Sequence, residues 1–429
     1  MIPGALLLLL LLLSVPVGIA FTLLVMAKAE EWNVDWSLFP SITFDTITVF
    51  PLLAIPLFLL GGELMSRGGL IRQLTAVCDI ILGRVRAPMG HVMIAASALM
   101  GAITGSSVAT VAAIGGTVGK EMIQRGYAPG YTAALNASAG LLGVLIPPSI
   151  PLILYGSIVG ISITQLFIAS IMPGIVMMLA FMMAHAFLAR RALQGGNEAL
   201  PSSSAGPGAA SAAHPRHRIV LRAVPALLLP IIVLGGIYTG VFTPTEAAAV
   251  AAVYALLVTL LGKLTSIKEL EKVFLSASLS SAAILVIIGF TSIFNRAMVL
   301  EQIPQSIAAF AVTFTDNPLI FLLIVNAVLL IVGMFMETNA AVLLMGPLLA
   351  PAAQQYGIDP IHFAIVLVTN IELGLLTPPL AANLYVAARS NKVPLTDVLR
   401  HLGWFFAVTL VVMAMITYVP QLSLWHQYL

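Results

Sequence analysis

Two stretches of sequence decide the fold: GVLIPPS (143–149) and GLLTPPL (374–380). Each lies inside a long apolar run and combines a glycine with two adjacent prolines. Proline has no N–H to donate, so each pair interrupts a helix that would otherwise continue. Backbone groups that are freed inside a bilayer are costly unless a partner binds them. The two breaks therefore predict two places where irregular backbone lines a cavity or a bound ion.

The composition indicates that the chain lies in a membrane. Hydrophobic residues make up 60% of its 429 positions, only 8% are charged, and the mean hydropathy is +1.06. Apolar runs of about 20 residues recur from end to end, as in helical membrane proteins. The short alternating segments of a β-barrel are absent from the sequence. We therefore expect an all-α polytopic membrane protein.

The sequence argues against several other classes of protein. The single cysteine, Cys78, excludes an intrachain disulfide framework and a CxxC metal site. The seven histidines lack metal-ligand spacing, and there is no Walker A loop for ATP hydrolysis. No nucleophile–base pair is visible. We expect no enzymatic activity, no organic cofactor and no nucleic-acid partner.

Nine apolar segments are predicted to cross the membrane, the first being a retained span rather than a signal peptide. Two others, 88–119 and 318–352, have small or polar residues at their centres and are predicted to be re-entrant hairpins. The alternative is that each is an ordinary pair of short spans. The nine spans are 4–27, 44–65, 131–160, 164–189, 223–242, 246–262, 275–294, 361–388 and 402–420.

The basic residues favour the hairpin interpretation. With the N-terminus inside and both hairpins re-entrant, 17 of the 19 lysines and arginines fall in cytoplasmic segments. Only Lys28 and Arg296 fall outside, which is the bias expected of a correct topology. The C-terminus then lies on the opposite side. The weakly amphipathic segments 68–86 and 297–315 are predicted to lie along the interfaces.

An internal repeat relates the two halves. A shift of 231 residues, from 143 to 374, aligns 105–148 without a gap and makes 12 of 44 positions identical. The charge bias makes the halves run in opposite directions, an inversion typical of secondary transporters. We assign the repeats to 1–194 and 243–429, a cytoplasmic linker to 195–222 and an extra span to 223–242. The identical residues in the first half are Ala109, Val111, Gly115, Gln124, Gly126, Pro129, Ala133, Leu142, Gly143, Leu145, Pro147 and Pro148.

Each hairpin centre is predicted to form an ion site with the ProPro loop of its own half. Hydroxyl and carbonyl oxygens without dense carboxylates suit Na⁺ better than Ca²⁺. The alternative is that proline and glycine only kink packed helices. The first site is predicted to contain Ser106, Ser107, Gly143, Leu145 and Pro147, and the second Thr338, Asn339, Gly374 and Thr377.

Acidic residues at membrane depth are functional candidates by default. Glu337 and Glu372 are such residues, and with Asn136, Ser149 and Asn383 they are the candidate substrate contacts. The asparagines could instead join helices, and Glu372 could bond to neighbouring backbone. No lysine or arginine lies at this depth, so helix N-termini, hydroxyls and bound cations would have to meet a substrate carboxylate.

Two further polar features are predicted to be structural. Thr243, Pro244 and Glu246 fit a helix-capping box with proline at the first helical position. His185 falls near the cytoplasmic end of its span, where a packing role is expected.

Five motifs together resemble the large membrane subunit of tripartite ATP-independent periplasmic (TRAP) transporters. They are GSSVAT (105–110), GVLIPPS (143–149), GVFTPTEAA (240–248), GMFMET (333–338) and GLLTPP (374–379), and the resemblance covers essentially the whole chain. It implies an elevator-type secondary transporter of the ion-transporter superfamily. The family's Na⁺ sites lie at the hairpin tips and facing loops, which fits the residues named above. The family usually has aspartate where this chain has Glu337.

The resemblance also implies a function, a cellular location and partner proteins. It implies import of an organic acid, such as a C4-dicarboxylate, sialic acid or a related carboxylate, driven by two or more Na⁺ ions. The location would be the bacterial inner membrane, with the N-terminus cytoplasmic and the C-terminus periplasmic. A separate small four-helix (Q) subunit and a periplasmic substrate-binding (P) protein are expected partners. The rival functions are a stand-alone Na⁺/dicarboxylate symporter of the same superfamily and an ion channel.

Overall fold

A computed structural model describes residues 17–32, 35–85, 87–192 and 216–427, together with Leu10 and Val15. In this described part the chain is helical, and no β-strand is present. Eight of its segments are long and apolar enough to cross a membrane. The all-α polytopic class predicted from composition is therefore confirmed. Part of the predicted span 4–27 and most of the predicted linker 195–222 lie outside the described residues.

The first half supplies the elements between residues 17 and 192. Short 3-10 turns, η1 (Trp36–Leu38) and η2 (Phe50–Leu53), flank α3. The others are α2 (Val17–Lys28), α3 (Phe39–Ile47), α4 (Ala54–Arg67), α5 (Leu70–Leu82), α6 (Pro88–Thr104), α7 (Ser107–Ile114), the π-helical turn η3 (Gly115–Gly119), α8 (Lys120–Gln124), α9 (Pro129–Ala139), α10 (Leu142–Leu145), α11 (Ile150–Val159) and α12 (Ile163–Ala192).

The second half begins at residue 216 and ends in two short 3-10 turns, η4 (Pro420–Leu422) and η5 (Trp425–Gln427). Its helices are α13 (Arg216–Tyr238), α14 (Pro244–Leu261), α15 (Ile267–Leu300), α16 (Ile303–Phe314), α17 (Pro318–Phe335), α18 (Thr338–Gln355), α19 (Pro360–Gly374), α20 (Ala382–Asn391) and α21 (Leu395–Tyr418).

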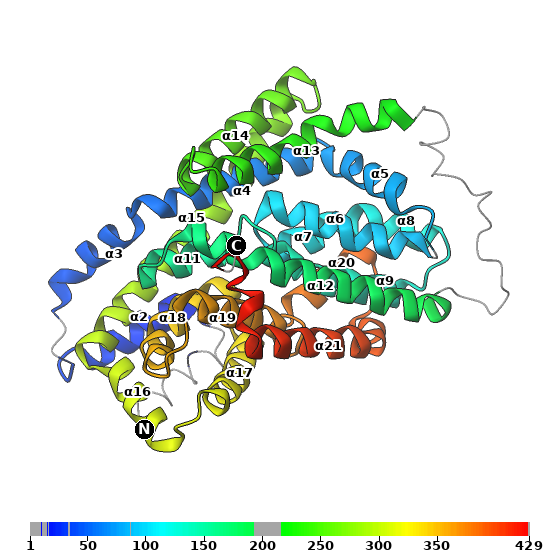
Figure 1. The fold of residues 1–429 in the computed structure, drawn as a ribbon. Helices are drawn as coiled ribbons and strands as arrows, with labels where there is room; N and C mark the ends of the chain where they lie inside the picture. The colour runs from blue at the N-terminus through cyan, green and yellow to red at the C-terminus, as the bar shows by residue number, and fades with distance from the viewer. Residues whose placement is uncertain are drawn as a thin grey trace.

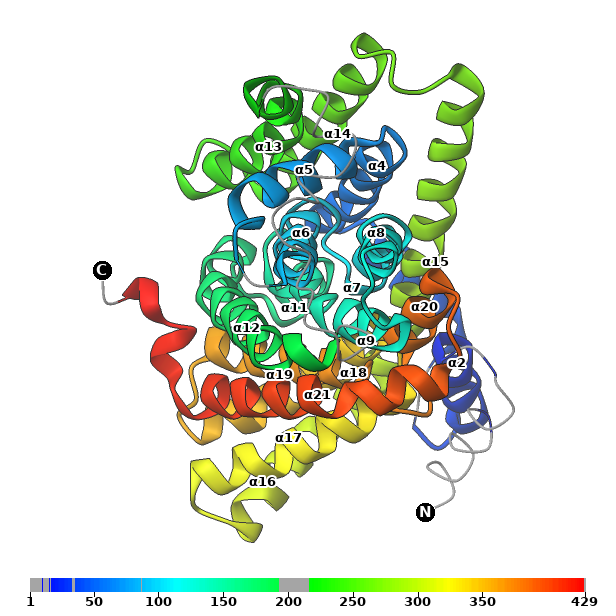
Figure 2. The same ribbon diagram turned by 90° about the vertical axis from the view of Figure 1, so that its right-hand side faces the viewer.

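The helices form two groups. In the scaffold group, α4 packs on α14 and α15, α15 packs on α2 and α3, and α13 packs on α5 and α14. The core group contains α6–α12 and α17–α21. Figure 1 shows α13, α14, α4 and α5 along the top of the molecule, above the helices of the first hairpin. Figure 2 shows α9, α12, α19 and α21 in the middle of the core group.

The two predicted breaks are present. The first separates α10 from α11 at residues 146–149, and the second separates α19 from α20 at residues 375–381. In both, the two prolines are joined by a cis peptide bond. The halves after the breaks cross over: α11 packs against α18 of the second hairpin, and α20 packs against α7 of the first. The two repeats are therefore interlocked rather than side by side.

A matched pair of polar contacts follows the repeat. Tyr131 Oη lies 2.6 Å from His185 Nδ1, and His185 Nε2 lies 2.9 Å from the Ala87 carbonyl oxygen. Because a carbonyl only accepts, Nε2 carries the proton and Nδ1 accepts from the tyrosine. A shift of 231 converts Tyr131 into His362, whose Nε2 donates to the Thr417 carbonyl at 3.2 Å. Each broken helix is thus joined to a long span by one buried hydrogen bond, and the structural role predicted for His185 is confirmed.

We expect Tyr131→Phe to lower the thermal stability of the purified protein. The variant leaves His185 Nδ1 buried without a donor, a loss of about 1–3 kcal/mol. Tyr385→Phe is the matched control, because that side chain is 53% exposed. The two variants are compared by their unfolding temperatures in detergent. Equal temperatures would contradict the role of the Tyr131–His185 bond.

Three predicted boundaries are wrong by several residues. The span 44–65 is interrupted between α3 and α4, since Pro51 cannot continue the hydrogen bonding of α3. The linker 195–222 ends earlier, because residues 216–222 form the first turns of α13; their aliphatic and basic side chains favour helix. The extra span 223–242 accordingly ends at Tyr238, before Gly240 adopts a φ of +74°.

The span 275–294 is only the middle of α15, which is 34 residues long. Ser266 caps its start by accepting from the Glu269 N–H at 3.3 Å, and no proline interrupts it. The capping box predicted at the start of α14 is confirmed. Thr243 Oγ1 accepts from the Glu246 N–H at 3.3 Å, and the Glu246 carboxylate accepts from the Thr243 N–H at 2.8 Å.

Candidate functional site: two hairpin tips facing two broken helices

The tip of the first hairpin, tip 1 (105–107), is made by a change of backbone conformation. Gly105 adopts a φ of +61°, which ends α6, and Ser106 is extended. Ser106 Oγ then accepts from the Ala109 N–H at 3.4 Å and caps α7. The Gly105 carbonyl accepts from the Ile150 N–H at 3.1 Å. Tip 1 is therefore tied to the end of the first broken region, loop 1 (143–149).

Glycine allows loop 1 to approach tip 1 closely. A Cβ atom on Gly143 would lie 2.6 Å from Thr110 Oγ1 and 2.7 Å from the Ser106 carbonyl oxygen. Ser107, Leu145 and Pro147 are buried beside this contact. Of the five residues predicted for the first ion site, Ser106, Ser107 and Gly143 lie against one another, while Leu145 and Pro147 follow in loop 1 and the Leu145 carbonyl faces Gly174 of α12.

The tip of the second hairpin, tip 2 (336–338), is capped by an acid. Glu337 Oε2 accepts from the N–H groups of Asn339 at 3.0 Å and Ala340 at 3.4 Å, and Oε1 accepts from Asn339 Nδ2 at 2.8 Å. Both oxygens of Glu337 therefore serve the start of α18, where a negative charge also complements the helix dipole. The structure places Glu337 as a cap rather than as a free carboxylate.

Loop 2 (374–380) is also tied to the hairpin of its own half, at the end of α17 just before tip 2. The Leu380 N–H donates to the Met334 carbonyl at 3.0 Å. A Cβ atom on Gly374 would lie 2.3 Å from the carbonyl carbon of Gly333, so the two glycines touch backbone to backbone. Thr377 Oγ1 donates to the Leu373 carbonyl at 3.4 Å, which keeps its hydroxyl close to its own helix.

Glu372 lies between the two tips. It is 1% exposed, and its Oε1 accepts from the hydroxyl of Thr338 at 2.8 Å. The side chain of Ser107, the repeat equivalent of Thr338, lies near the same carboxyl group. Oε2 is buried and has no hydrogen-bond partner among the described residues. A buried acceptor without a partner is rare, and it leaves this oxygen open to a cation or a donor.

Other buried polar atoms without partners accompany Glu372 in the described part. They are Ser149 Oγ after loop 1, both side-chain polar atoms of Asn383 after loop 2, Asn339 Oδ1 and Asn136 Oδ1. Asn136 also donates from Nδ2 to the Val111 carbonyl at 3.0 Å, so it joins α9 to the first hairpin. Ser149 and Asn383 each stand at the start of the half-helix that follows a break.

Helix starts converge on this region. The segments α7 and α18 begin at the tips, and α11 and α20 begin at the ends of the broken loops. Some of the first N–H groups of α7, α18 and α11 are already paired, with Ser106 Oγ, the Glu337 carboxylate and the Gly105 carbonyl. The partial positive charge at the four helix starts still suits an anion. The described residues contain no group of three or more His, Cys, Asp or Glu side chains able to hold a metal ion. The region around Glu372 and the two tips could bind a cation through one carboxylate and the surrounding hydroxyl, amide and carbonyl oxygens.

The sequence alone does not indicate that Thr338 and Glu372 are partners. It predicts Glu372 as a substrate contact and Thr338 as an ion ligand. The available signal is the repeat itself, since it makes Ser107 and Thr338 equivalent and brings both tips to the centre. Sequence reasoning also misses Asn326, which accepts from Asn370 Nδ2 at 2.7 Å and donates to Thr417 Oγ1 at 3.0 Å.

A polytopic helical protein with paired hairpins and broken helices meeting at its centre belongs to the class of secondary transporters. The sequence model of the family described as "Tripartite ATP-independent periplasmic transporter, DctM component" matches residues 5–422, and the chain belongs to this family. It is 39% identical over 383 residues to the C4-dicarboxylate TRAP transporter large permease protein DctM of Pseudomonas aeruginosa, covering 89% of this chain and 87% of that protein.

Other relatives carry different substrate names. The chain is 34% identical to the sialic acid TRAP transporter large permease protein SiaM of Vibrio cholerae, covering 87% of this chain and 86% of that one. It is 35% identical to the isethionate TRAP transporter permease protein DctMQ of Oleidesulfovibrio alaskensis, covering 97% of this chain but 64% of that protein. As a family member, the chain is a transporter permease rather than an enzyme.

Solved structures support the fold alone. The YdaH transporter of Alcanivorax borkumensis matches with a TM-score of 0.59 at 14% identity, covering 92% of this chain and 89% of that one. MtrF of Neisseria gonorrhoeae matches with a TM-score of 0.54 at 14% identity, covering 89% and 84%.

Proposed function

We propose that this chain is the large membrane subunit of a Na⁺-coupled importer of organic anions in the bacterial inner membrane. The observation that carries the proposal is Glu372, whose buried Oε2 has no partner among the described residues although the hydroxyls of two equivalent tips approach the same carboxyl group. An uncompensated buried carboxylate is costly, and a bound cation removes that cost. A monovalent cation suits a centre with one available carboxylate.

The substrate class rests on charge and on the relatives. C4-dicarboxylate, sialic acid and isethionate permeases are all named for organic anions. Helix N-termini and bound cations are the positive groups that the centre offers. Glu337 already occupies the start of α18, so the starts of α11 and α20, with Ser149 and Asn383, are the favoured contacts for a substrate carboxylate.

Membership of the family supports the partners and the motion that we propose. A small four-helix Q subunit and a periplasmic P protein would complete the transporter, and the longer DctMQ relative supports a partner in the membrane. The core group would slide as an elevator against the scaffold group. The N-terminus would be cytoplasmic and the C-terminus periplasmic, as the charge bias predicts.

Uptake by proteoliposomes tests the proposal. The chain is reconstituted with its Q subunit, and radiolabelled organic acids are supplied with and without the P protein and with and without an inward Na⁺ gradient. Uptake should require the Na⁺ gradient and the P protein. Uptake by further liposomes that contain this chain without the Q and P proteins would favour the stand-alone symporter, and ion current without substrate would establish a channel.

A second prediction concerns the hydroxyl groups of Ser107 and Thr338 at the two tips. Ser107→Ala and Thr338→Ala should each raise the Na⁺ concentration needed for half-maximal uptake by roughly three- to tenfold, because each removes a neutral ligand worth about 1 kcal/mol. Na⁺ titration of initial uptake rates measures this. Ser41→Ala is the control, since that hydroxyl is exposed and distant in the scaffold group. Unchanged Na⁺ dependence in both variants would remove the tips from the ion sites.

A further inference from the structure

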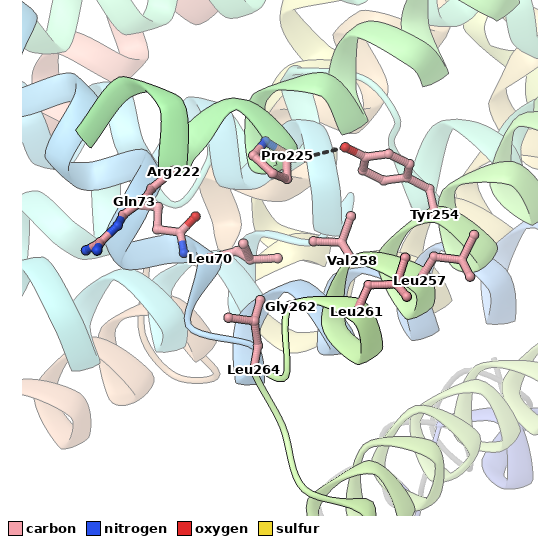
Figure 3. A pocket seen from close by; sticks show the side chains of 10 residues that line it. All are labelled: Leu70, Gln73, Arg222, Pro225, Tyr254, Leu257, Val258, Leu261, Gly262 and Leu264. Atoms are coloured by element: carbon pink, nitrogen blue, oxygen red, sulfur yellow. Dashed lines mark hydrogen bonds between the residues drawn. The ribbon is translucent and has the colours of Figure 1, made fainter. Parts of the chain in front are cut away.

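A second site lies away from Glu372 and the two tips, in a cavity of the scaffold group. The cavity has a volume of about 600 Å³ and opens where α5, α13 and α14 meet (Figure 3). One wall is closed by Tyr254, whose hydroxyl donates to the Pro225 carbonyl at 2.9 Å. The proposed transport chemistry uses none of the residues around this cavity.

The cavity is polar at one end and apolar at the other. Figure 3 shows Arg222 and Gln73 together at one end, and Leu257, Val258 and Leu261 toward the opposite end. Arg222 is exposed and forms no ion pair with the described residues. Gln73 Oε1 is buried and has no hydrogen-bond partner in the described part of the chain. The polar end thus offers a cationic donor beside a free acceptor.

The residues around the cavity place it near the cytoplasmic surface of the membrane. Leu257 is 48% exposed and Leu261 is 80% exposed, so both side chains are open to the acyl chains of a surrounding bilayer. By the charge bias, the start of α13 and the end of α14 are cytoplasmic, and Lys263 follows shortly after α14. Basic pockets between membrane helices on this side are suited to lipid headgroups.

We infer that this cavity binds one anionic phospholipid with a hydroxylated headgroup, of the phosphatidylglycerol type. Its phosphate pairs with the Arg222 guanidinium, which suits phosphate in shape and charge. A headgroup hydroxyl donates to Gln73 Oε1, and one acyl chain lies along Leu257 and Leu261. The bound lipid joins the arm α5 to the pair α13–α14 and fixes this corner of the scaffold.

Native mass spectrometry of the full-length chain tests the inference. The protein is purified in detergent, and phosphatidylglycerol or phosphatidylcholine is added at matched concentration. The wild type should retain one phosphatidylglycerol in preference to phosphatidylcholine, which has no headgroup hydroxyl and no net charge. Equal retention of the two lipids would overturn the inference. Glycerol phosphate should not displace the lipid, because it lacks the acyl chain; displacement would mean that the site takes the free phosphate.

Matched variants separate the two ends of the cavity. Arg222→Gln should weaken phosphatidylglycerol retention roughly tenfold, since a charge-assisted contact is lost. Arg72→Gln, exposed on α5 outside the cavity, should change nothing. Leu257→Trp should fill the apolar end and abolish retention, whereas Leu260→Trp, 46% exposed on the same helix but outside the cavity, should not. Retention that is equal within each pair would refute the site.

Discussion

Glu372→Gln is expected to raise the Na⁺ concentration needed for half-maximal uptake by about 10- to 100-fold. The amide still accepts from Thr338, so the local packing is preserved, but the charge that would hold a cation is gone. A charge-assisted contact is worth about 1.5–3 kcal/mol, and about 1.4 kcal/mol corresponds to tenfold in affinity. The measurement is a Na⁺ titration of uptake in proteoliposomes containing the partner proteins.

The Glu372→Gln experiment needs a control variant and a check that the variant is folded. Glu301→Gln, at the exposed end of α15, is the control and should behave as the wild type. The variant must also elute as a single species with an unchanged unfolding temperature. If a folded Glu372→Gln protein keeps the wild-type Na⁺ dependence, the carboxylate is not an ion ligand.

Gly374→Ala is expected to abolish uptake and to lower the unfolding temperature. A methyl group there would meet the Gly333 backbone at 2.3–2.7 Å, and a backbone atom cannot move aside as a flexible side chain can. Overpacking of this kind costs about 1–3 kcal/mol or more. The expected damage is to the contact between loop 2 and the end of α17, just before tip 2, beside the proposed second ion site.

Gly235→Ala tests whether the effect is steric. Gly235 lies inside α13, and a methyl group added there would meet no atom within 4 Å, so alanine should be neutral or slightly stabilising. Uptake and unfolding temperature are measured for both variants. A Gly374→Ala protein with normal uptake would show that loop 2 is not held against tip 2 during transport.

The breaks and the hairpins can be predicted from the sequence because they depend on local chemistry. Adjacent prolines remove helix donors wherever they occur, and Gly105 and Glu337 are residues that end or begin helices. The repeat adds the long-range information that each tip meets a loop of its own half. The crossed packing of α11 on α18 and of α20 on α7 cannot be predicted in this way, since it depends on how the repeats dock.

The centre can be predicted only in part for the same reason. Glu372 and Thr338 are 34 positions apart, and no periodicity links them. An acid at membrane depth suggests function, which makes Glu337 a candidate substrate contact, yet its oxygens cap a helix. The boundaries of α13 and α15 escape prediction because the hydropathy of a span fades before its helix ends.

Loop 1 and loop 2 also differ in their exposure, which their similar sequences do not indicate. Pro147 and Pro148 are buried, whereas Pro378 and Pro379 are exposed. In the first half α12 covers the loop: a Cβ atom on its Gly174 would lie 3.2 Å from the Leu145 carbonyl oxygen. The equivalent position in the second half is Phe405, which packs on Tyr131 and Phe181 instead.

This difference has a kinetic consequence for the proposed transporter. In the proposed transporter, an ion at loop 2 would exchange through the exposed side of that loop, but an ion at loop 1 would be enclosed by protein. The two ions would then bind and leave in a fixed order, the enclosed one first in and last out. Two chemically similar sites would therefore differ in how fast they exchange their ions.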